Sequence, residues 1–399
     1  MITNKNNILL LGASLESDNK GVNALGVGAI TLLKNNYKNA KISLLCVGQQ
    51  TTHEKELTIS SEIVKVKLCY FTKHEILKSL KEAYLYKFFG VKSKLEVSEL
   101  IQSSDIVFDI NEGDSFSDIY GSRRIIRHFT DSKLILSWKK PLVFLPQTLG
   151  PFDTVIGKFL GAHILKRLHK LYVRDIKAFN FLDKIGVKKE LSIDMAVYMN
   201  PKEIPVEVKP NTVGINVSGL MYLNRYKSLD SKYNNYPVFL KQLVERIIKE
   251  GYEVMLIPHT YNSISPNVED DLEGTRKFVK DNPDLASKIS FIDQDYSAQE
   301  LKYVISKTVF FMGSRMHSCI AALSTSVPTI GLSYSYKFEG TFKMFKQQGL
   351  VIDVNHLEED TIDGLINKIL VAISIKKEIK SVLLNENKRE QLSLENIDN

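Results

Sequence analysis

The chain has 399 residues, of which 44% are apolar and 25% charged, and its formal net charge is +7. This length fits two domains, and the composition excludes a fibrous or wholly disordered protein. No apolar run approaches the roughly 20 residues that cross a bilayer, and the start of the sequence does not resemble a secretion signal. We therefore expect a cytoplasmic globular protein, and its mixed charges give no indication of nucleic-acid binding.

The first half of the chain alternates short β-branched runs with helical periods, which is typical of parallel sheets covered by helices. It opens with a strand at Ile8 to Leu11, a polar Gly/Asn loop, and a helix near Ala24 to Lys34. Further strands are predicted at residues 41–47, 63–68, 105–109, 142–145, 171–173 and 191–193.

The segment from Asn200 to Pro210 contains three prolines and little apolar periodicity, which favours an interdomain linker. After it, strands are predicted at residues 212–217, 254–257, 289–292, 308–312 and 329–332. We therefore predict an α/β protein of two Rossmann-like domains facing a cleft, at residues 1–202 and 203–375. Residues 376–399 are predicted as a terminal helix or tail with a solvated face, and a basic membrane-contact helix is the alternative.

Ligands of parallel sheets bind beyond the carboxyl ends of the strands, so residues that follow strands are the candidates for a site. The segment Gly313-Ser-Arg-Met-His317 follows a buried strand and opens a helix, with Ser314 as the expected N-cap. Backbone N–H groups there and the Arg315 guanidinium would bind an anion, although Arg315 could instead pair with a carboxylate. Ser314, His317 and Ser318 share one helical face, away from the stripe of Met316, Ile320 and Leu323.

A second polar segment follows the next strand and runs from Tyr334 to Lys337. Because Lys337 lies one strand over from His317 in the expected order, the two adjacent strand ends offer Arg315, His317 and Lys337 to one small anion. An ordinary surface lysine is the alternative for Lys337.

The segments Gly313-Ser-Arg-Met-His317 and Tyr334-Ser-Tyr-Lys337 resemble the carboxyl-domain signature of polysaccharide pyruvyltransferases. Segments that fall in the same family order are Gln147-Thr-Leu-Gly-Pro151, Val173-Arg-Asp175, Ile193-Asp194, Pro258-His259 and Asp295-Tyr-Ser297. The resemblance implies a pair of domains like those of GT-B glycosyltransferases, phosphoenolpyruvate as the donor, and a sugar hydroxyl pair as the acceptor. It also implies a donor site at His317 and Lys337. At Gly21-Val22 the chain departs from the family pattern, in which an acidic residue often follows the glycine.

The amino-terminal domain is then expected to hold the acceptor sugar, because two of its loops are rich in side chains that bind sugars. Phe116 or Tyr120 could stack on a sugar face, and turn formation is the alternative role for the acidic residues. The predicted acceptor-binding residues are Asp18, Asn19, Asn23, Glu112, Asp114, Ser115, Asp118 and Gln147.

The expected reaction transfers a pyruvyl group from phosphoenolpyruvate to a sugar as a ketal, in the biosynthesis of a cell-surface polysaccharide. His317 is the candidate for acid–base chemistry or phosphate contact, and Arg315 and Lys337 stabilise charge. Ser314, Ser318, Tyr334 and Arg174 are predicted to bind the donor. Asp18, Asp114 or Asp118 is the candidate base, and the scheme needs no metal or cofactor.

Two other functions remain open from the sequence. One is a nucleotide-sugar glycosyltransferase of the same architecture, and the other is a non-catalytic member that binds glycan. The acceptor could be a free or lipid-linked sugar, and the latter would place the protein at the inner face of the membrane.

Overall fold

The computed structural model describes residues 5–225, 232–262, 264, 267–334, 337–355, 357–388 and 392–394. The chain divides into two compact units. Of the described residues, the first unit contains 5–15, 25–200 and 392–394, and the second contains 16–24 and 201–388. Our predicted domains, 1–202 and 203–375, did not anticipate that residues 16–24 belong with the second unit.

The first unit is built on one sheet, whose order within the described chain is β3-β4-β2-β1-β5-β6-β7-β8. All of its pairings are parallel except that of β3 with β4, a hairpin at the edge of the sheet. Its strands are β1 (Asn7–Leu11), β2 (Lys41–Val47), β3 (His53–Ile59), β4 (Glu62–Phe71), β5 (Ile106–Asp109), β6 (Leu142–Gln147), β7 (Lys170–Val173) and β8 (Glu190–Leu191).

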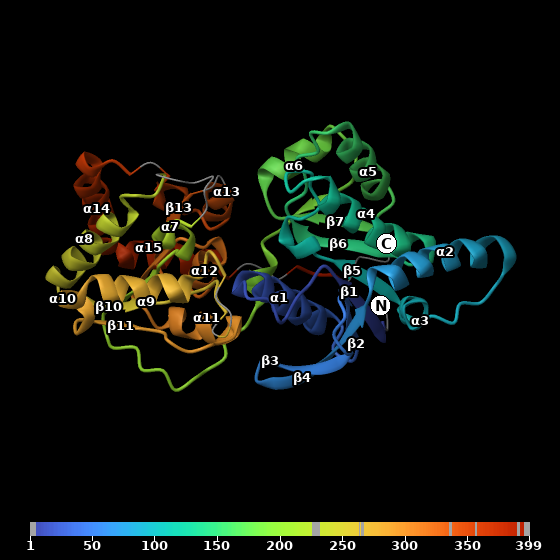
Figure 1. Ribbon diagram of the computed structural model, residues 1–399, viewed down its shortest axis with the longest axis horizontal. Helices are drawn as coiled ribbons and strands as arrows, with labels where there is room; N and C mark the ends of the chain where they lie inside the picture. The colour runs from blue at the N-terminus through green and yellow to red at the C-terminus, as the bar shows by residue number, and fades with distance from the viewer. Residues whose placement is uncertain are drawn as a thin grey trace. The chain divides into compact units, whose positions relative to one another are not determined.

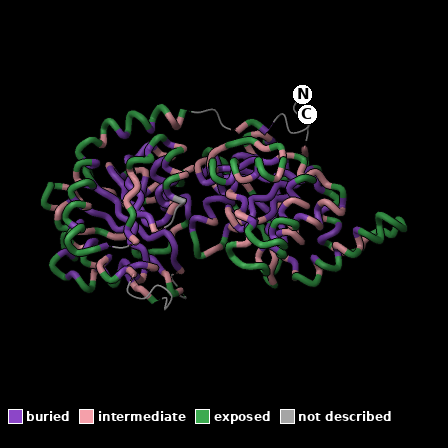
Figure 2. Tube along the Cα trace, turned by 90° about the horizontal axis from the view of Figure 1, so that it is seen from above, coloured by how far each residue is buried: buried purple, intermediate pink, exposed green. Residues whose placement is uncertain are grey.

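Helices connect these parallel strands and cover the sheet (Figure 1). They are α1 (Lys20–Asn36), whose first residues, up to Ala24, belong to the second unit, α2 (Lys73–Phe89), α3 (Glu96–Ser103), α4 (Ser122–Ser137), α5 (Val155–Leu165) and α6 (Ile176–Asp183). Strands β5 and β6 are buried along their whole length, as expected for apolar strands covered on both faces. Figure 2 shows buried chain in the middle of the unit and exposed helices around it.

The second unit has a parallel sheet with the order β11-β10-β9-β12-β13-β14 among its described strands, which is the doubly wound order of a Rossmann fold. These strands are β9 (Thr212–Asn216), β10 (Glu253–Leu256), β11 (Ile289–Phe291), β12 (Phe310–Gly313), β13 (Thr329–Ser333) and β14 (Val351–Asp353). Its helices are α7 (Gly219–Leu223), α8 (Tyr236–Lys249), α9 (Asp271–Asp281), α10 (Pro283–Ala286), α11 (Ala298–Ser306), α12 (Met316–Ser324), α13 (Lys337–Met344), α14 (Glu359–Ser374) and α15 (Lys376–Glu386).

In each sheet the strand order reverses at one point, beside which ligands of such folds bind. In the first unit this point lies between β1 and β5, where Leu11 pairs with Asp109. In the second unit it lies between β9 and β12, where Asn216 pairs with Gly313. The predicted α/β class and the Rossmann-like character of both halves are therefore confirmed.

The structure also shows that no helix among the described residues is long and apolar enough to span a bilayer.

Candidate functional site

A buried carboxylate, Asp271, organises the carboxyl edge of the second sheet. Its oxygens accept hydrogen bonds from the amide of Asn216 and from the backbone N–H groups of Gly219, His259 and Thr260, at 2.9–3.2 Å. These donors lie at or just after the ends of β9 and β10, so one side chain ties two strand ends together. We did not predict Asp271 from the sequence, where the available signal was the acidic pair Asp270-Asp271 at the start of a helix.

Arg315 belongs to the same network. Its Nε and Nη2 atoms donate to Asp271 at 3.1 and 2.9 Å, and Nη1 donates to Glu269 at 2.8 Å. Burial opposes the positive charge, but Asp271 and Glu269 hold the pKa of Arg315 well above its usual value. We expected either an anion-binding fork or a carboxylate pair, and the structure shows the carboxylate pair, which makes Arg315 a residue that positions the loop.

Helix α12 begins one residue later than we predicted. Arg315, not Ser314, is the cap residue, and no side-chain hydrogen bond caps the helix among the described residues. The predicted N-cap is wrong because the Ser314 hydroxyl lies 3.2 Å from the Tyr236 hydroxyl instead. Ser318 is also buried, and its hydroxyl donates to the Arg315 carbonyl at 2.7 Å. Both predicted donor ligands are thus engaged inside the unit.

His317 lies in the first turn of α12, half-buried, and its ring packs against Gly21 at the start of α1. A Cβ atom added to Gly21 would lie 2.4 Å from Nδ1 of His317 and 2.9 Å from its Cβ. The amino-terminal ends of α1 and α12 therefore meet at this imidazole. Because a helix amino terminus carries a partial positive charge, the position favours an anion.

Two further basic residues lie nearby: His259, which is close to both His317 and Lys20, and Lys20, which directly precedes Gly21. We call His317, His259 and Lys20 the basic cluster. Lys20 begins α1, and its Nζ atom lies 2.7 Å from Asp295 and 4.8 Å from the ring centre of Tyr261. The backbone N–H of Lys20 donates to the His259 carbonyl at 3.2 Å. From the sequence, His259 and Asp295 were noted only within segments in family order, and Lys20 was not identified.

His259 is 1% exposed, and among the described residues its Nδ1 atom has no hydrogen-bond partner. Burial, together with the neighbouring His317, Arg315 and Lys20, lowers the pKa of His259 to about 3. The ring is therefore neutral throughout the physiological range, so a change in activity between pH 5 and 8 would not report its titration.

The loop after β13 contains the remaining predicted donor residues. Tyr334 is half-buried, and its ring centre lies 6.3 Å from that of Phe338. The backbone of Lys337 begins α13, whereas its side chain lies outside the described part of the structure. The placement of Lys337 at the carboxyl edge therefore agrees with the expected strand order, and its role stays a prediction.

We expected the predicted acceptor residues Asp18, Asn19 and Asn23 to lie in the first unit. They belong to the second unit instead. The Asp18 carboxylate accepts from the Asn262 amide at 2.9 Å, and Asn19 forms a β-bridge with Thr260. Both polar atoms of the Asn23 amide bond to the backbone of Ser17. These residues fasten the loop before α1 to the edge that carries the basic cluster.

In the first unit, the predicted acceptor loop after β5 is largely occupied by its own contacts. Glu112 forms ion pairs with Arg124 at 2.5 Å and Arg127 at 2.9 Å. Burial opposes its ionisation, yet the two arginines hold the pKa of Glu112 below its usual value. Ser115 donates to Glu112 at 3.2 Å, and Asp114 accepts from the Tyr120 hydroxyl at 2.8 Å.

Asp118 has the turn-forming role that we gave as its alternative. It accepts hydrogen bonds from the backbone of Asp153 and Thr154 and from the Thr154 hydroxyl, at 2.7–3.1 Å. Phe116 cannot stack on a sugar as proposed, because it is fully buried with edge contacts to Phe144 and Phe152.

Gln147 and Asn111 lie at the carboxyl edge of the first sheet with unsatisfied polar atoms. Gln147 donates to the Asp109 carbonyl at 3.0 Å, while its Oε1 atom and both polar atoms of the Asn111 amide are buried without partners in the described chain. Asn111 has a left-handed φ of 41°. Burial raises the pKa of Asp109 to about 8, so its carboxyl is protonated at neutral pH. We did not predict Asn111 or Asp109 as site residues.

Arg174, a predicted donor ligand, is buried in the first unit. Its Nη1 atom lies 2.5 Å from Asp194, and Nε donates to the Thr148 hydroxyl at 3.0 Å. Burial opposes the charge, and Asp194 raises the pKa of Arg174. The arginine thus links the ends of β6, β7 and β8.

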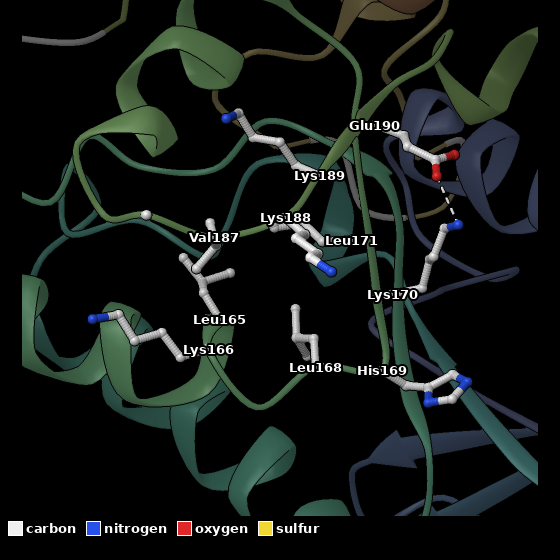
Figure 3. Close-up of a pocket in the computed structure, with 11 residues that line it drawn as sticks. Leu165, Lys166, Leu168, His169, Lys170, Leu171, Val187, Lys188, Lys189 and Glu190 are labelled. Atoms are coloured by element: carbon white, nitrogen blue, oxygen red, sulfur yellow. Dashed lines mark ion pairs between the residues drawn. The ribbon is translucent and has the colours of Figure 1, made fainter. Parts of the chain in front are cut away.

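A pocket of about 770 Å³ lies at the opposite, amino-terminal ends of β7 and β8 (Figure 3). Its lining includes Lys166, His169 and Lys188, and Figure 3 shows the ion pair of Lys170 with Glu190, which spans 2.6 Å. Because parallel sheets bind ligands at their carboxyl edges, we do not assign this pocket to the site.

Solved structures of low sequence identity share the fold. A UDP-GlcNAc 2-epimerase from Methanocaldococcus jannaschii has a TM-score of 0.52 at 16% identity, with 92% of each chain covered. A glycosyltransferase from Rickettsia africae has a TM-score of 0.51 at 12% identity, with 96% of this chain and 94% of that chain covered. These matches place the protein among folds built from two Rossmann-like domains of the GT-B type.

Sequence comparison points to one family. The amylovoran biosynthesis protein AmsJ of Erwinia amylovora is 20% identical over 289 residues, which cover 69% of this chain and 68% of AmsJ. The family model described as polysaccharide pyruvyl transferase matches residues 19–336, a range that includes the whole basic cluster. This chain therefore belongs to the polysaccharide pyruvyl transferase family.

Proposed function

We propose that the protein transfers a pyruvyl group from phosphoenolpyruvate to two hydroxyls of a sugar, forming a ketal and releasing phosphate, in polysaccharide biosynthesis. The observation that carries the proposal is that the amino termini of α1 and α12 meet at His317. Lys20 and the buried, neutral His259 belong to the same cluster. Such a position suits a small, highly charged anion. The family match supports the transferase class and a sugar acceptor.

In this reaction His317 protonates the methylene carbon of the donor as the oxygen of the first sugar hydroxyl bonds to the adjacent carbon. The second hydroxyl then displaces phosphate from that carbon. One of the two hydroxyl protons returns to His317, directly or through a base, and the other leaves on the released phosphate. Lys20, Lys337 and the opening of α12 stabilise the phosphate and carboxylate, while Asp271 holds Arg315 and the loop in place. Neither a metal nor a cofactor has a step in this scheme.

We assign the acceptor sugar to the carboxyl edge of the first sheet, around Gln147 and Asn111. Their unsatisfied amide atoms are the hydrogen-bonding type that binds sugar hydroxyls. Asp118 is committed to local hydrogen bonds, which leaves Asp18 and Asp114 of the three predicted bases.

The test is donor binding by calorimetry, with phosphoenolpyruvate and a panel of nucleotide sugars as separate ligands. We expect phosphoenolpyruvate alone to bind the wild-type protein, and His317→Ala and Lys337→Ala to weaken binding. Lys343→Ala is the matched control for Lys337→Ala, because Lys343 is an exposed lysine on the same helix. Binding of a nucleotide sugar instead would show a glycosyltransferase, and binding of neither would favour a non-catalytic member.

A further inference from the structure

Helix α2 carries an exposed apolar and basic surface along its carboxyl-terminal half. All nine residues from Tyr84 to Lys92 are exposed, with the sequence Tyr-Leu-Tyr-Lys-Phe-Phe-Gly-Val-Lys. Phe88 and Phe89 are 68% and 75% exposed, and Val91 is 54% exposed. The surface of a soluble protein rarely exposes so many large apolar side chains together unless they contact a partner.

The opposite face of α2 fixes the helix to the first unit. Ile76, Ser79 and Ala83 are buried there, and Ser79 accepts a hydrogen bond from the Trp138 indole at 3.2 Å. The last buried position of α2 is Ala83, and the Tyr86 ring in the following turn lies 5.6 Å from the Trp138 ring, so only the last turn of the helix extends past this packing. In Figure 2 this extension is the exposed helix at the end of the first unit, and Figure 1 labels it α2.

The end of α2 is shaped by Gly90, whose left-handed φ of 68° terminates the helix. Nothing lies within 4 Å of the position that a Cβ would take there. The turn presents Val91 and Lys92 directly after Phe88 and Phe89. Residues 88–92, which we call the tip, therefore form a short, ordered apolar projection that the first unit does not cover.

The charges around this tip are positive. Between Lys73 and Lys94 the sequence has six lysines and two glutamates, and there is no acidic residue from residue 84 to residue 92. Glu82, the glutamate nearest the tip, accepts hydrogen bonds from Ser93 and Ser98. Aromatic side chains interleaved with lysines are the composition that binds the interface of an anionic bilayer.

We propose that the surface formed by residues 84–92 docks the protein onto an anionic phospholipid membrane, with Phe88, Phe89 and Val91 inserted among the lipids and the lysines facing their headgroups. This surface lies on α2, and not on the terminal helix that the sequence analysis considered for membrane contact. The proposal does not depend on the identity of the donor, because it concerns a different face of the chain.

The test is co-sedimentation of the full chain with vesicles of phosphatidylcholine, with and without phosphatidylglycerol, in the absence of any donor. We expect binding only to the vesicles that contain phosphatidylglycerol, and weaker binding as salt increases. Phe88→Ser/Phe89→Ser and Lys87→Glu/Lys92→Glu should each weaken binding at least about tenfold. All four residues are exposed, so neither variant removes a buried contact.

Two matched variants serve as controls. Val371→Ser removes an apolar side chain that is 62% exposed on α14, and Lys377→Glu/Lys380→Glu reverses two exposed lysines on α15. Both should leave vesicle binding unchanged. The proposal is overturned if wild type ignores phosphatidylglycerol vesicles, if both α2 variants bind as wild type does, or if the α15 variant alone loses binding. A dimer that Phe88→Ser/Phe89→Ser converts to a monomer, without vesicle binding, would show a second copy as the occupant.

Discussion

Replacement of Gly21 by alanine should disable the site without unfolding the protein. The added Cβ would lie 2.4 Å from Nδ1 of His317, whereas an ordinary contact needs at least 3.4 Å. The difference requires the imidazole or the first turn of α1 to move by about 1 Å. A misplacement of about 1 Å in a catalytic group can reduce the rate about a hundredfold.

The backbone itself should tolerate this change. Gly21 lies in the first turn of α1, and alanine is up to about 1 kcal/mol more favourable than glycine inside a helix. Gly364 in α14 is the matched control, because nothing lies within 4 Å of the position of its added Cβ. We expect Gly364→Ala to keep full activity and to be as stable as wild type or slightly more stable.

The assay is phosphate release from phosphoenolpyruvate in the presence of an acceptor, alongside chemical denaturation of each variant. We expect Gly21→Ala to lose about two orders of magnitude in kcat/KM while keeping a denaturation midpoint near that of wild type. Activity of Gly21→Ala equal to that of Gly364→Ala would show that the imidazole of His317 is not held against α1.

Three further predictions concern buried or paired charges. Lys20→Met should reduce kcat/KM in the phosphate assay about a hundredfold, with little change in the denaturation midpoint. The control Lys202→Met removes a surface pair with Glu300 and should retain activity. Asp271→Asn should lower the free energy of unfolding by about 3–5 kcal/mol, because Arg315 loses its buried counter-ion. The control Glu273→Gln, in the surface pair with Arg225, should lower it by less than about 1 kcal/mol. Equal losses in the two variants would show that Asp271 does not stabilise the fold through Arg315. Because the folded-state pKa of Asp109, about 8, lies above its ordinary value of 3.8, the folded state holds the proton more tightly and wild-type stability should fall as pH rises from 4 to 8. Denaturation at both pH values should show a smaller fall for Asp109→Asn, and an unchanged fall would contradict the burial of this carboxyl.

Much of the fold could be predicted because it follows from local patterns. Buried parallel strands read as short apolar runs, so β2 was predicted at its observed bounds, and β6, β9 and β13 nearly so. Two strands were missed for a physical reason. In β3 three consecutive charged residues, Glu54 to Glu56, lie on the edge strand, and β14 has only three residues, so neither carries the apolar run that identifies a buried strand.

The candidate site was predicted in part for the same reason. Polar residues directly after strands are visible in the sequence, and this rule led to His317 and Lys337, whereas Gln147 came from the family resemblance. It could not show which polar groups are already satisfied. Arg315, Arg174 and Asp118 have the composition of ligands, yet each is committed to partners that come from other elements.

The sequence alone therefore determined the α/β class, the positions of most strands along the chain and the family resemblance, because each depends on neighbours along the chain. Tertiary structure assigned residues 16–24 to the second unit and brought Lys20 to Asp295, which lies 275 positions away. It also placed Gly21 against His317 and joined Asp271 to three strand ends. Local periodicity carries no information on such contacts, because they form only when the whole edge of the sheet is assembled.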